Sequence, residues 1–304
     1  MIGILAVLFS SVVWGTTGTA ATFAPEVGAA AIGAAAMGVG GLLQAVIAGR
    51  GILRRLPDLK THWRNLLLGG VAVAIYPLAF YASMRMAGVT IGTVVTIGSA
   101  PLLSALIEYL FDGTRLSRQW LLGAMIGLVG MVLIAVAKGS AHTDAETAHA
   151  TLLGIGLGLL GGLTYALYSW TARRLMVQGI GSTVAMGATF GIGGMLLMPV
   201  LLATGGPFLA SWNNAGVGLY MAIVPMFFGY ICFGIGLARI SASLATTITL
   251  IEPVVAALLA VVIVGERLPP LGWLGVVLVI SCLAVISIPR RQSAKQNAET
   301  AFST

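Results

Sequence analysis

The stretch from Ser241 to Val264 reads SASLATTITLIEPVVAALLAVVIV, and it decides the fold class. Glu252 is its only charged residue, and as a helix the run is long enough to cross about 30 Å of hydrocarbon. Comparable apolar runs lie at residues 3–23, 27–49, 65–85, 88–110, 118–137, 151–174, 182–204, 214–237 and 271–288. We therefore expect an all-α membrane protein with ten transmembrane helices.

The composition excludes an ordinary soluble protein. Of the 304 residues, 58% are hydrophobic and 8% are charged, whereas a typical soluble domain carries about 25% charged residues. The mean hydropathy is +1.01, and the 41 glycines suit close helix packing in lipid. The net charge of +7 does not gather on a basic face that could hold a phosphate backbone, so we expect the lipid bilayer and no nucleic acid as a partner.

The two cysteines and the first residues carry no further signal. Cys232 and Cys282 lie in apolar runs without a His or Cys neighbour at metal-ligand spacing. We expect buried thiols, no disulfide and no metal site. Met1 leads directly into an apolar run with no basic segment before it, which favours a first transmembrane span over a cleaved signal peptide.

Basic residues predict the orientation of the chain. When loops are assigned alternately from a cytoplasmic N-terminus, 13 of the 16 Lys and Arg residues fall on the cytoplasmic side. The three others are Arg85, Lys138 and Arg267. Cytoplasmic loops carry such an excess of positive charge, so we expect both termini in the cytoplasm.

The sequence also contains an internal repeat. Residues 101–134 align with residues 253–286 at a shift of 152 positions (253 minus 101). The informative matches are Pro101 with Pro253, and the pattern Gly-x-Arg-Leu at 113–116 with the same pattern at 265–268. Each half holds five expected spans, and because five is odd the second half enters the membrane from the opposite side. Inverted repeats of this kind are typical of secondary transporters.

A set of short motifs carries a family resemblance. They are EPVVAALLA at 252–260, GERL at 265–268 and WLG at 273–275, with reduced copies AP at 100–101, GTRL at 113–116 and WLLG at 120–123. The chain resembles the EamA-type exporters of the drug/metabolite transporter superfamily, and among them the ten-helix amino-acid exporters, including those of aromatic amino acids. The first copy departs from the pattern at Ala100 and Thr114, where the second has Glu252 and Glu266.

The resemblance implies two five-helix repeats around a central substrate cavity. They would occupy residues 1–140 and 151–289, with an external linker at 141–150 and a cytoplasmic tail at 290–304. It implies a multi-pass protein of the plasma membrane, the inner membrane of a bacterium, without a cofactor. Because one chain contains both repeats, we expect a monomer.

Four prolines lie near the middle of corresponding spans in the two halves. They are Pro77, Pro101, Pro225 and Pro253. A proline inside a helix removes a backbone hydrogen bond, and breaks at matching positions of two repeats indicate the binding region and the bending helices. The alternative is that these prolines form static kinks.

Polar and aromatic side chains at mid-depth are the candidate substrate-binding residues. They are Trp14, Thr17, Tyr76, Phe80, Tyr81, Thr96, Ser99, Tyr165, Tyr168, Ser169 and Glu252. Trp14 and Tyr165 occupy equivalent positions of the two repeats. An aromatic cavity with a few hydroxyl groups would suit a zwitterion with an apolar side chain. Ordinary helix packing is the alternative for each residue.

Glu252 is the acidic residue nearest the middle of a span. Placing a charge there costs about 2.5–3.5 kcal/mol, so it should face a cavity or a partner. It could contact a substrate ammonium or exchange protons; alternatively, a neutral Glu252 bonds to carbonyls freed by Pro253. Glu108, near the cytoplasmic end of its span, is interpreted as an interfacial charge.

These observations predict a secondary transporter that exports amino acids, including aromatic and apolar ones, or related metabolites by alternating access. Another small-molecule substrate, such as a cationic drug or a nucleotide sugar, is the alternative. A membrane enzyme or a receptor is the competing class, but the sequence contains neither a catalytic motif nor a large soluble domain. Gly156-x-Gly158-x-x-Gly161 lies inside an apolar run, so we interpret it as helix packing rather than a nucleotide site.

Overall fold

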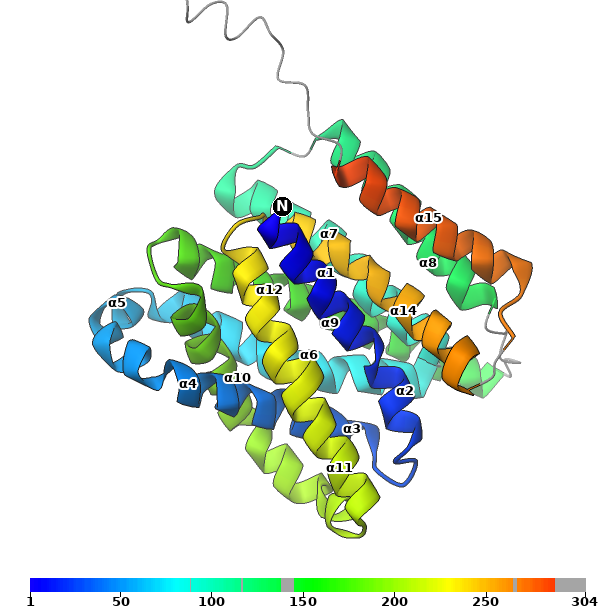
Figure 1. The fold of residues 1–304 in the computed structure, drawn as a ribbon, viewed down its shortest axis with the longest axis horizontal. Coiled ribbons are helices and arrows are strands. Elements are labelled where there is room, and N and C mark those ends of the chain that lie inside the picture. Colours follow the sequence, from blue (N-terminus) through cyan, green and yellow to red (C-terminus); the bar gives the residue numbers. More distant parts are fainter. Residues whose placement is uncertain (88, 116, 138–144, 265–266, 288–304) are drawn as a thin grey trace, which may run out of the picture.

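The computed structural model describes residues 1–87, 89–115, 117–137, 145–264 and 267–287, and these ranges are helical with short connections and no strand (Figure 1). The α-helices are α1 (Ile2–Gly15), α2 (Thr17–Thr22), α3 (Ala29–Gly33), α4 (Gly40–Arg54), α5 (Leu56–Thr61), α6 (Trp63–Ala87), α7 (Val89–Asp112), α8 (Arg118–Ala137), α9 (Ala145–Val177), α10 (Ser182–Thr204), α11 (Trp212–Met221), α12 (Gly229–Leu237), α13 (Ala242–Ile248), α14 (Glu252–Leu259) and α15 (Pro270–Ser287). Irregular turns join some of them: the π-helical turns η1 (Ala34–Val39), η3 (Ala222–Phe228) and η5 (Ala260–Val264), and the 3₁₀ turns η2 (Gly206–Leu209) and η4 (Thr249–Ile251). The expected all-α class is confirmed.

Eight helical stretches within the described ranges are long and apolar enough to cross a membrane. They are Ile2–Thr22, Ala29–Arg54, Trp63–Ala87, Ile91–Asp112, His149–Val177, Ser182–Thr204, Trp212–Leu237 and Ala242–Ile263. Two shorter apolar helices, Arg118–Ile134 and Pro270–Ile286, coincide with the fifth and tenth expected spans. The protein is therefore a multi-pass membrane protein.

The two shorter helices, α8 and α15, lie side by side in Figure 1. Their contact depends on two glycines that face each other. A Cβ atom at Gly130 would lie 2.7 Å from the carbonyl oxygen of Gly275, and one at Gly275 would lie 2.5 Å from that of Gly130. Small residues let helix backbones approach closely where lipid supplies no hydrophobic driving force, which explains the high glycine content along this pair.

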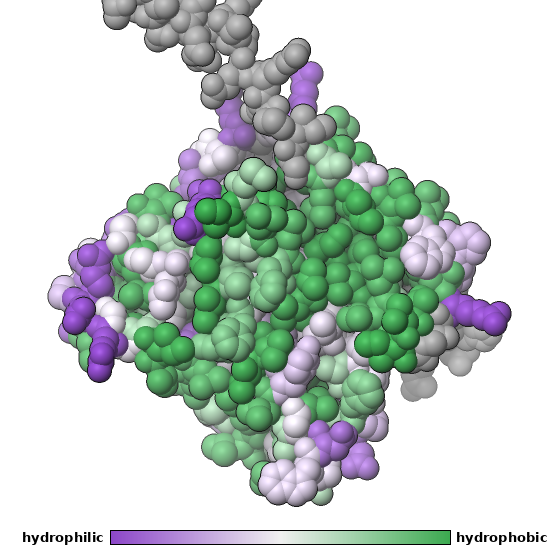
Figure 2. Space-filling view, viewed as in Figure 1, coloured by the Kyte–Doolittle hydropathy of each residue, from purple (hydrophilic) through white to green (hydrophobic). Residues whose placement is uncertain are grey.

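The outer surface of the helices is apolar. Figure 2 shows hydrophobic residues over most of the visible face and hydrophilic residues near its margins. Large apolar side chains such as Leu122, Val262 and Val277 are 63%, 78% and 57% exposed. A continuous apolar surface of this kind indicates contact with lipid rather than water.

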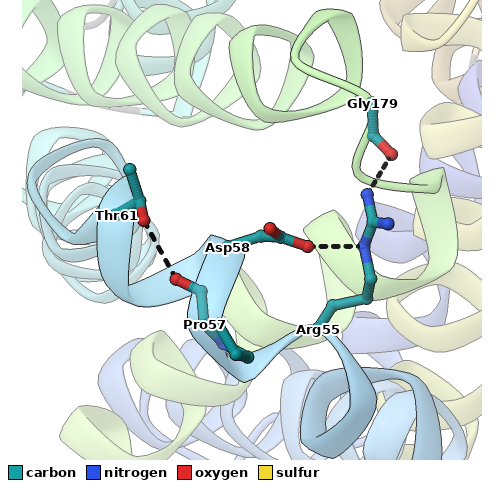
Figure 3. A network of polar contacts seen from close by, with 5 residues as sticks. All are labelled: Arg55, Pro57, Asp58, Thr61 and Gly179. Atoms are coloured by element: carbon teal, nitrogen blue, oxygen red, sulfur yellow. Dashed lines mark hydrogen bonds and ion pairs between the residues drawn. The ribbon is translucent and has the colours of Figure 1, made fainter.

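Polar contacts connect loops at the two ends of the helices. At one end, Arg55 pairs with Asp58 at 2.9 Å and donates a hydrogen bond to the carbonyl oxygen of Gly179 at 2.6 Å (Figure 3). The segment around α5 thereby contacts the turn after α9. At the other end, the Asn213 amide donates to the carbonyl oxygen of Phe23, which joins the connection after α2 to the start of α11.

The connection between the two halves is helical in part. Helix α9 begins at Ala145, within the range 141–150 that the sequence predicts as the external linker. The run AETAHATLL at 145–153 is rich in alanine, the best helix former, and therefore extends the helix. Residues 141–144, Lys138, Gly265, Glu266 and the expected tail at 290–304 lie outside the described residues.

Candidate substrate cavity

A cavity lies where α1, α2, α3, α6, α9, α12 and α14 meet the turns η1 and η3. Its lining residues are Trp14, Thr17, Gly33, Ala36, Met37, Tyr76, Pro77, Phe80, Tyr81, Tyr165, Met226, Tyr230 and Glu252. The cavity has a volume of about 30 Å³, enough for roughly two water molecules. A larger solute therefore requires the surrounding helices to move apart.

Trp14 forms one wall of the cavity. It is 4% exposed, and its indole Nε1–H donates to the carbonyl oxygen of Pro225 at 2.8 Å. Its ring centroid lies 4.6 Å from that of Tyr230 and 5.2 Å from that of Phe233. The π-helical turn η3 alters the backbone hydrogen-bond pattern around Pro225. The indole is therefore held by both packing and a hydrogen bond.

Two tyrosines of α9 connect this wall to neighbouring helices. The Tyr165 hydroxyl donates to Thr249 Oγ1 at 3.0 Å, which attaches α9 to η4. The Tyr168 and Tyr230 hydroxyl oxygens lie 2.7 Å apart, which attaches α9 to α12. Each buried hydroxyl thus has a partner, as the cost of an unpaired polar group requires.

The opposite wall comes from α6. The rings of Tyr76 and Phe80 stack with centroids 5.8 Å apart, and the Tyr76 ring also lies 5.5 Å from that of Tyr165. The ring centroids of Phe80 and Tyr81 lie 5.2 Å apart. The hydroxyl groups of Tyr76 and Tyr81 make no hydrogen bond to any described residue. They are consequently free to bind a solute.

Glu252 is the acidic residue among those that line the cavity. It is the first residue of α14 and follows the 3₁₀ turn η4. Among the described residues its carboxylate has no hydrogen bond and no ion pair, and no Lys, Arg or His lines the cavity. The described residues also hold no group of three or more His, Cys, Asp or Glu side chains that could bind a metal. The cavity therefore combines one unpaired carboxylate with aromatic faces.

Not every candidate from the sequence lies at this cavity. Trp14, Thr17, Tyr76, Phe80, Tyr81, Tyr165 and Glu252 line it, whereas Thr96, Ser99, Tyr168 and Ser169 do not. Tyr168 supports the wall through Tyr230, as described above. Thr96 and Ser169 are fully buried, and their hydroxyl groups have no partner among the described residues.

Thr96 and Ser99 belong to the contact between α7 and α9. A Cβ atom at Gly161 would lie 2.8 Å from Thr96 Cγ2, and one at Gly162 would collide with Ser99 Oγ. The hydroxyl-bearing face of α7 thus fits against glycines rather than the cavity. Helix-face spacing identified a shared face correctly, but it could not distinguish a packing face from a lining face.

The four prolines have unequal surroundings. Pro225 lies within the π-helical turn η3, and Pro253 follows the 3₁₀ turn η4. In contrast, α6 and α7 remain α-helical through Pro77 and Pro101. Pro77 nevertheless lines the cavity, while Pro101 is buried elsewhere in α7. The irregular turns therefore accompany only the two prolines of the second half.

Sequence reasoning missed several lining residues. Gly33, Ala36, Met37 and Met226 are apolar and carry no polar signal; the first three come from α3 and η1. Tyr230 did carry a signal, because it is an aromatic residue near the middle of the expected span at 214–237. The same criterion that selected Tyr76 would have found it.

A second polar cluster lies at the α12–α13 connection. Glu108 is 3% exposed, and its carboxylate accepts hydrogen bonds from the backbone N–H of Ala242 at 2.7 Å and from the Ser243 hydroxyl. The Arg173 guanidinium donates to the carbonyl oxygens of Leu237, at 2.7 Å, and Ile240. An anion at a helix N-terminus and a cation at a C-terminus are both favourable.

The sequence interpretation of Glu108 as an interfacial charge stays a prediction, and the structure adds a packing role. The carboxylate is buried and caps the start of α13, while Arg173 caps the end of α12. Together they hold the turn between the two helices. The sequence could not show this role, because the partners lie 134 and 64 positions away in the chain.

A groove lies beside the central cavity, between α2, α11 and η5. It is lined by Thr16, Thr19, Ala20, Phe23, Trp212, Asn213, Gly216, Val217, Tyr220, Leu259 and Ile263, and it offers about 540 Å³ to water-sized spheres. Thr16 Oγ1 and the Tyr220 hydroxyl lie 2.7 Å apart. The next residue, Thr17, lines the central cavity, so the junction of α1 and α2 contributes to both spaces.

Similar proteins are transporters. The chain is 31% identical over 297 residues to the uncharacterized transporter YwfM of Bacillus subtilis (strain 168), covering 97% of both chains. It is 26% identical over 246 residues to the threonine/homoserine exporter RhtA of Escherichia coli (strain K12), covering 80% of this chain and 78% of RhtA. A solved crystal structure at 19% identity matches the fold with a TM-score of 0.76, covering 94% of this chain and 96% of that chain.

The family assignment rests on a match to both halves of the chain. The profile of the EamA-like transporter family matches twice, at residues 1–136 and 152–288. These two ranges together cover most of the 304 residues. The chain belongs to the EamA-like transporter family.

Proposed function

We propose that the chain is a secondary transporter that exports amino acids or related small metabolites across the plasma membrane by alternating access. The observation that carries the proposal is the central cavity, whose wall combines Trp14 and Tyr76 of the first half with Tyr165, Tyr230 and Glu252 of the second. RhtA, a relative over about four-fifths of the chain, is named as an exporter of threonine and homoserine. An aromatic cavity favours apolar side chains more than those of RhtA's named substrates.

In this proposal α8 and α15 also cross the membrane, which completes ten spans in two inverted repeats. At 1.5 Å per residue, their 20 and 18 residues reach about 30 Å and about 27 Å. The contact of Arg55 with Gly179 joins two loops that carry basic residues and are assigned to the cytoplasm. The contact of Asn213 with Phe23 joins two loops assigned to the outside. Each contact thus agrees with alternate crossing.

Alternating access requires contacts that close the cavity on the cytoplasmic side and on the outer side. On the side assigned to the cytoplasm, Glu108 and Arg173 hold the α12–α13 turn. On the outer side, we assign the closing contact to the hydrogen bond of Thr16 with Tyr220, two residues that line the groove. The small central space corresponds to a closed state, and a substrate enters when the inner contacts break and leaves when the outer one does. The protein works as a monomer in the bilayer, without a cofactor, because one chain supplies both halves of the cavity.

Among the alternative solutes, the lining favours a cation over an anion. The cavity contains the Glu252 carboxylate and no basic side chain, so it offers no counter-ion for the phosphates of a nucleotide sugar. A cationic drug fits this charge. It stays the second candidate.

Counterflow in proteoliposomes tests the proposal. Vesicles containing the purified protein are loaded with an unlabelled amino acid, and uptake of the labelled amino acid is followed. We expect transient accumulation of an apolar or aromatic amino acid with the wild-type chain, and a loss of at least tenfold in Trp14→Ala. Trp273→Ala, at a position 44% exposed on α15, is the control and should transport normally. Absence of counterflow for every amino acid tested would contradict the proposal.

A further inference from the structure

We propose that the central cavity selects its substrate by an ammonium group, which binds Glu252 among the aromatic rings, and that the cavity does not require a substrate carboxylate. The inference rests on the proposed function, since it names the chemistry that the transport cavity recognises. The expected substrates are primary amines with an apolar or aromatic body, including amino-acid amides and esters as well as amino acids.

The first argument is the unpaired carboxylate. Glu252 lines the cavity without a hydrogen bond or ion pair to any described residue, and no basic residue shares the cavity. The hydrogen bonds that a neutral, structural Glu252 would make to carbonyls near Pro253 are not present among the described residues. An unpaired carboxylate is costly where it is even half-buried, as Glu252 is, and an ammonium within contact distance reduces that cost.

The second argument is the set of rings around the carboxylate. Trp14, Tyr76, Tyr165 and Tyr230 line the same small space, with neighbouring centroids 4.6–6.4 Å apart. Aromatic faces attract a cation through their negative quadrupole, and the effect increases when the cation is desolvated. A carboxylate surrounded by such faces suits an ammonium group and an apolar body. It offers no advantage to an anion.

The third argument is that few hydrogen-bond donors of the cavity wall are available to a substrate carboxylate. Most polar donors of the wall are already engaged: Trp14 with Pro225, Tyr165 with Thr249 and Tyr230 with Tyr168. Thr17 donates its hydroxyl to the carbonyl oxygen of Trp14. Among the described lining residues, the neutral hydroxyls of Tyr76 and Tyr81 have no hydrogen bond, and the O–H of Tyr230 is free when Tyr168 is the donor in their shared bond. They can hold a carboxylate, but that group must also share the cavity with Glu252 and its like charge.

The ligand series that tests this inference varies one group at a time. Binding to the purified protein in detergent is measured by calorimetry for L-phenylalanine, L-phenylalaninamide, 2-phenylethylamine and 3-phenylpropionate. We expect the amide and the amine to bind at least as tightly as phenylalanine, and 3-phenylpropionate, which lacks the ammonium, to bind at least tenfold more weakly. Binding of 3-phenylpropionate as tight as that of 2-phenylethylamine would overturn the inference.

Variants assign the two groups to their partners. Glu252→Gln should weaken the binding of 2-phenylethylamine at least tenfold. Glu26 is an exposed acidic residue, and Glu26→Gln should leave that affinity unchanged. The double variant Tyr76→Phe/Tyr81→Phe should weaken the binding of phenylalanine by at least threefold more than the binding of 2-phenylethylamine. Equal losses for both ligands would contradict the assignment of the hydroxyls. If Glu252→Gln fails to fold, the ligand series on the wild-type protein still tests the ammonium inference, and the double tyrosine variant still tests the role of the hydroxyls.

The outcome is separable from that of the proposed function. If phenylalanine shows counterflow but 3-phenylpropionate binds as well as the amine, export stands and the ammonium inference fails. If the amines bind in the predicted order and no solute shows counterflow, the recognition chemistry stands and the transport proposal fails.

Discussion

Trp14 donates its indole N–H to the carbonyl oxygen of Pro225 across 2.8 Å, and this hydrogen bond joins the first helix of the chain to the π-helical turn η3. Gly229 stands beside the same indole, since a Cβ atom there would lie 2.7 Å from Trp14 Nε1. The indole is thus fixed between the two halves of the chain. Its orientation is a property of the tertiary structure rather than of α1 alone.

Trp14→Phe should reduce both stability and transport. The substitution keeps an aromatic ring but leaves the Pro225 carbonyl without its donor, and an unpaired buried acceptor costs about 1–3 kcal/mol. We expect a lower melting temperature in detergent and transport reduced several-fold at matched protein levels. Trp273→Phe on the exposed side of α15 should change neither. An unchanged melting temperature in Trp14→Phe would show that the hydrogen bond contributes nothing.

Glu108→Gln should loosen the closed end near the α12–α13 turn. The amide keeps the size of the carboxylate but removes the charge that faces the backbone N–H of Ala242 and the Ser243 hydroxyl. With Cys232 and Cys282 replaced by alanine, a cysteine at Thr17 reports access to the cavity. In inside-out vesicles its labelling by an impermeant thiol reagent should be at least fivefold faster in Glu108→Gln. Asp58→Asn, which affects only an exposed ion pair with Arg55, is the control. Equal labelling rates in the two variants would show that Glu108 does not help to close the cytoplasmic end.

Tyr220→Phe should loosen the opposite end. It removes the hydroxyl that lies 2.7 Å from Thr16 Oγ1 in the outer groove, the contact to which the proposal assigns the outer closure. The same Thr17→Cys reporter should be labelled at least threefold faster from outside intact cells. Tyr109→Phe, at a tyrosine 55% exposed on α7, is the matched control. Thr16→Val removes this hydrogen bond together with the one that Thr16 Oγ1 donates to the carbonyl oxygen of Val13. Adding Tyr220→Phe to Thr16→Val should therefore raise the labelling rate no further than Thr16→Val alone.

The sequence predicted the helices well, because an apolar run in lipid must satisfy its own backbone hydrogen bonds. Each expected span coincides with a helical stretch. Matched motifs such as Gly113-x-Arg115 also indicated the family, whose profile matches both halves. These conclusions depend on local composition and on spacing along the chain, both of which a single sequence contains.

The cavity was predictable only in part. Tyr76 and Glu252 were identified because polar or charged groups at mid-depth in a membrane are costly and commonly mark functional sites. Thr96 satisfied the same criterion, yet it packs on Gly161. The capping role of Glu108 could not be predicted, because its partners lie at the start of a distant helix. Which face of a helix meets a cavity depends on tertiary packing, and no local pattern encodes it.

The topology gives the last prediction, and it follows from which loops touch. Thr61 ends α5 at the end where Arg55 binds Gly179 (Figure 3), and basic residues assign that end to the cytoplasm. Trp212, 94% exposed, begins α11 at the opposite end, beside the Asn213 contact with Phe23. In the background without native cysteines, Trp212→Cys should react with an impermeant maleimide in intact cells, and Thr61→Cys only after permeabilisation. Reaction of both cysteines in intact cells would place the two loops on one side and exclude alternate crossing of the membrane between them.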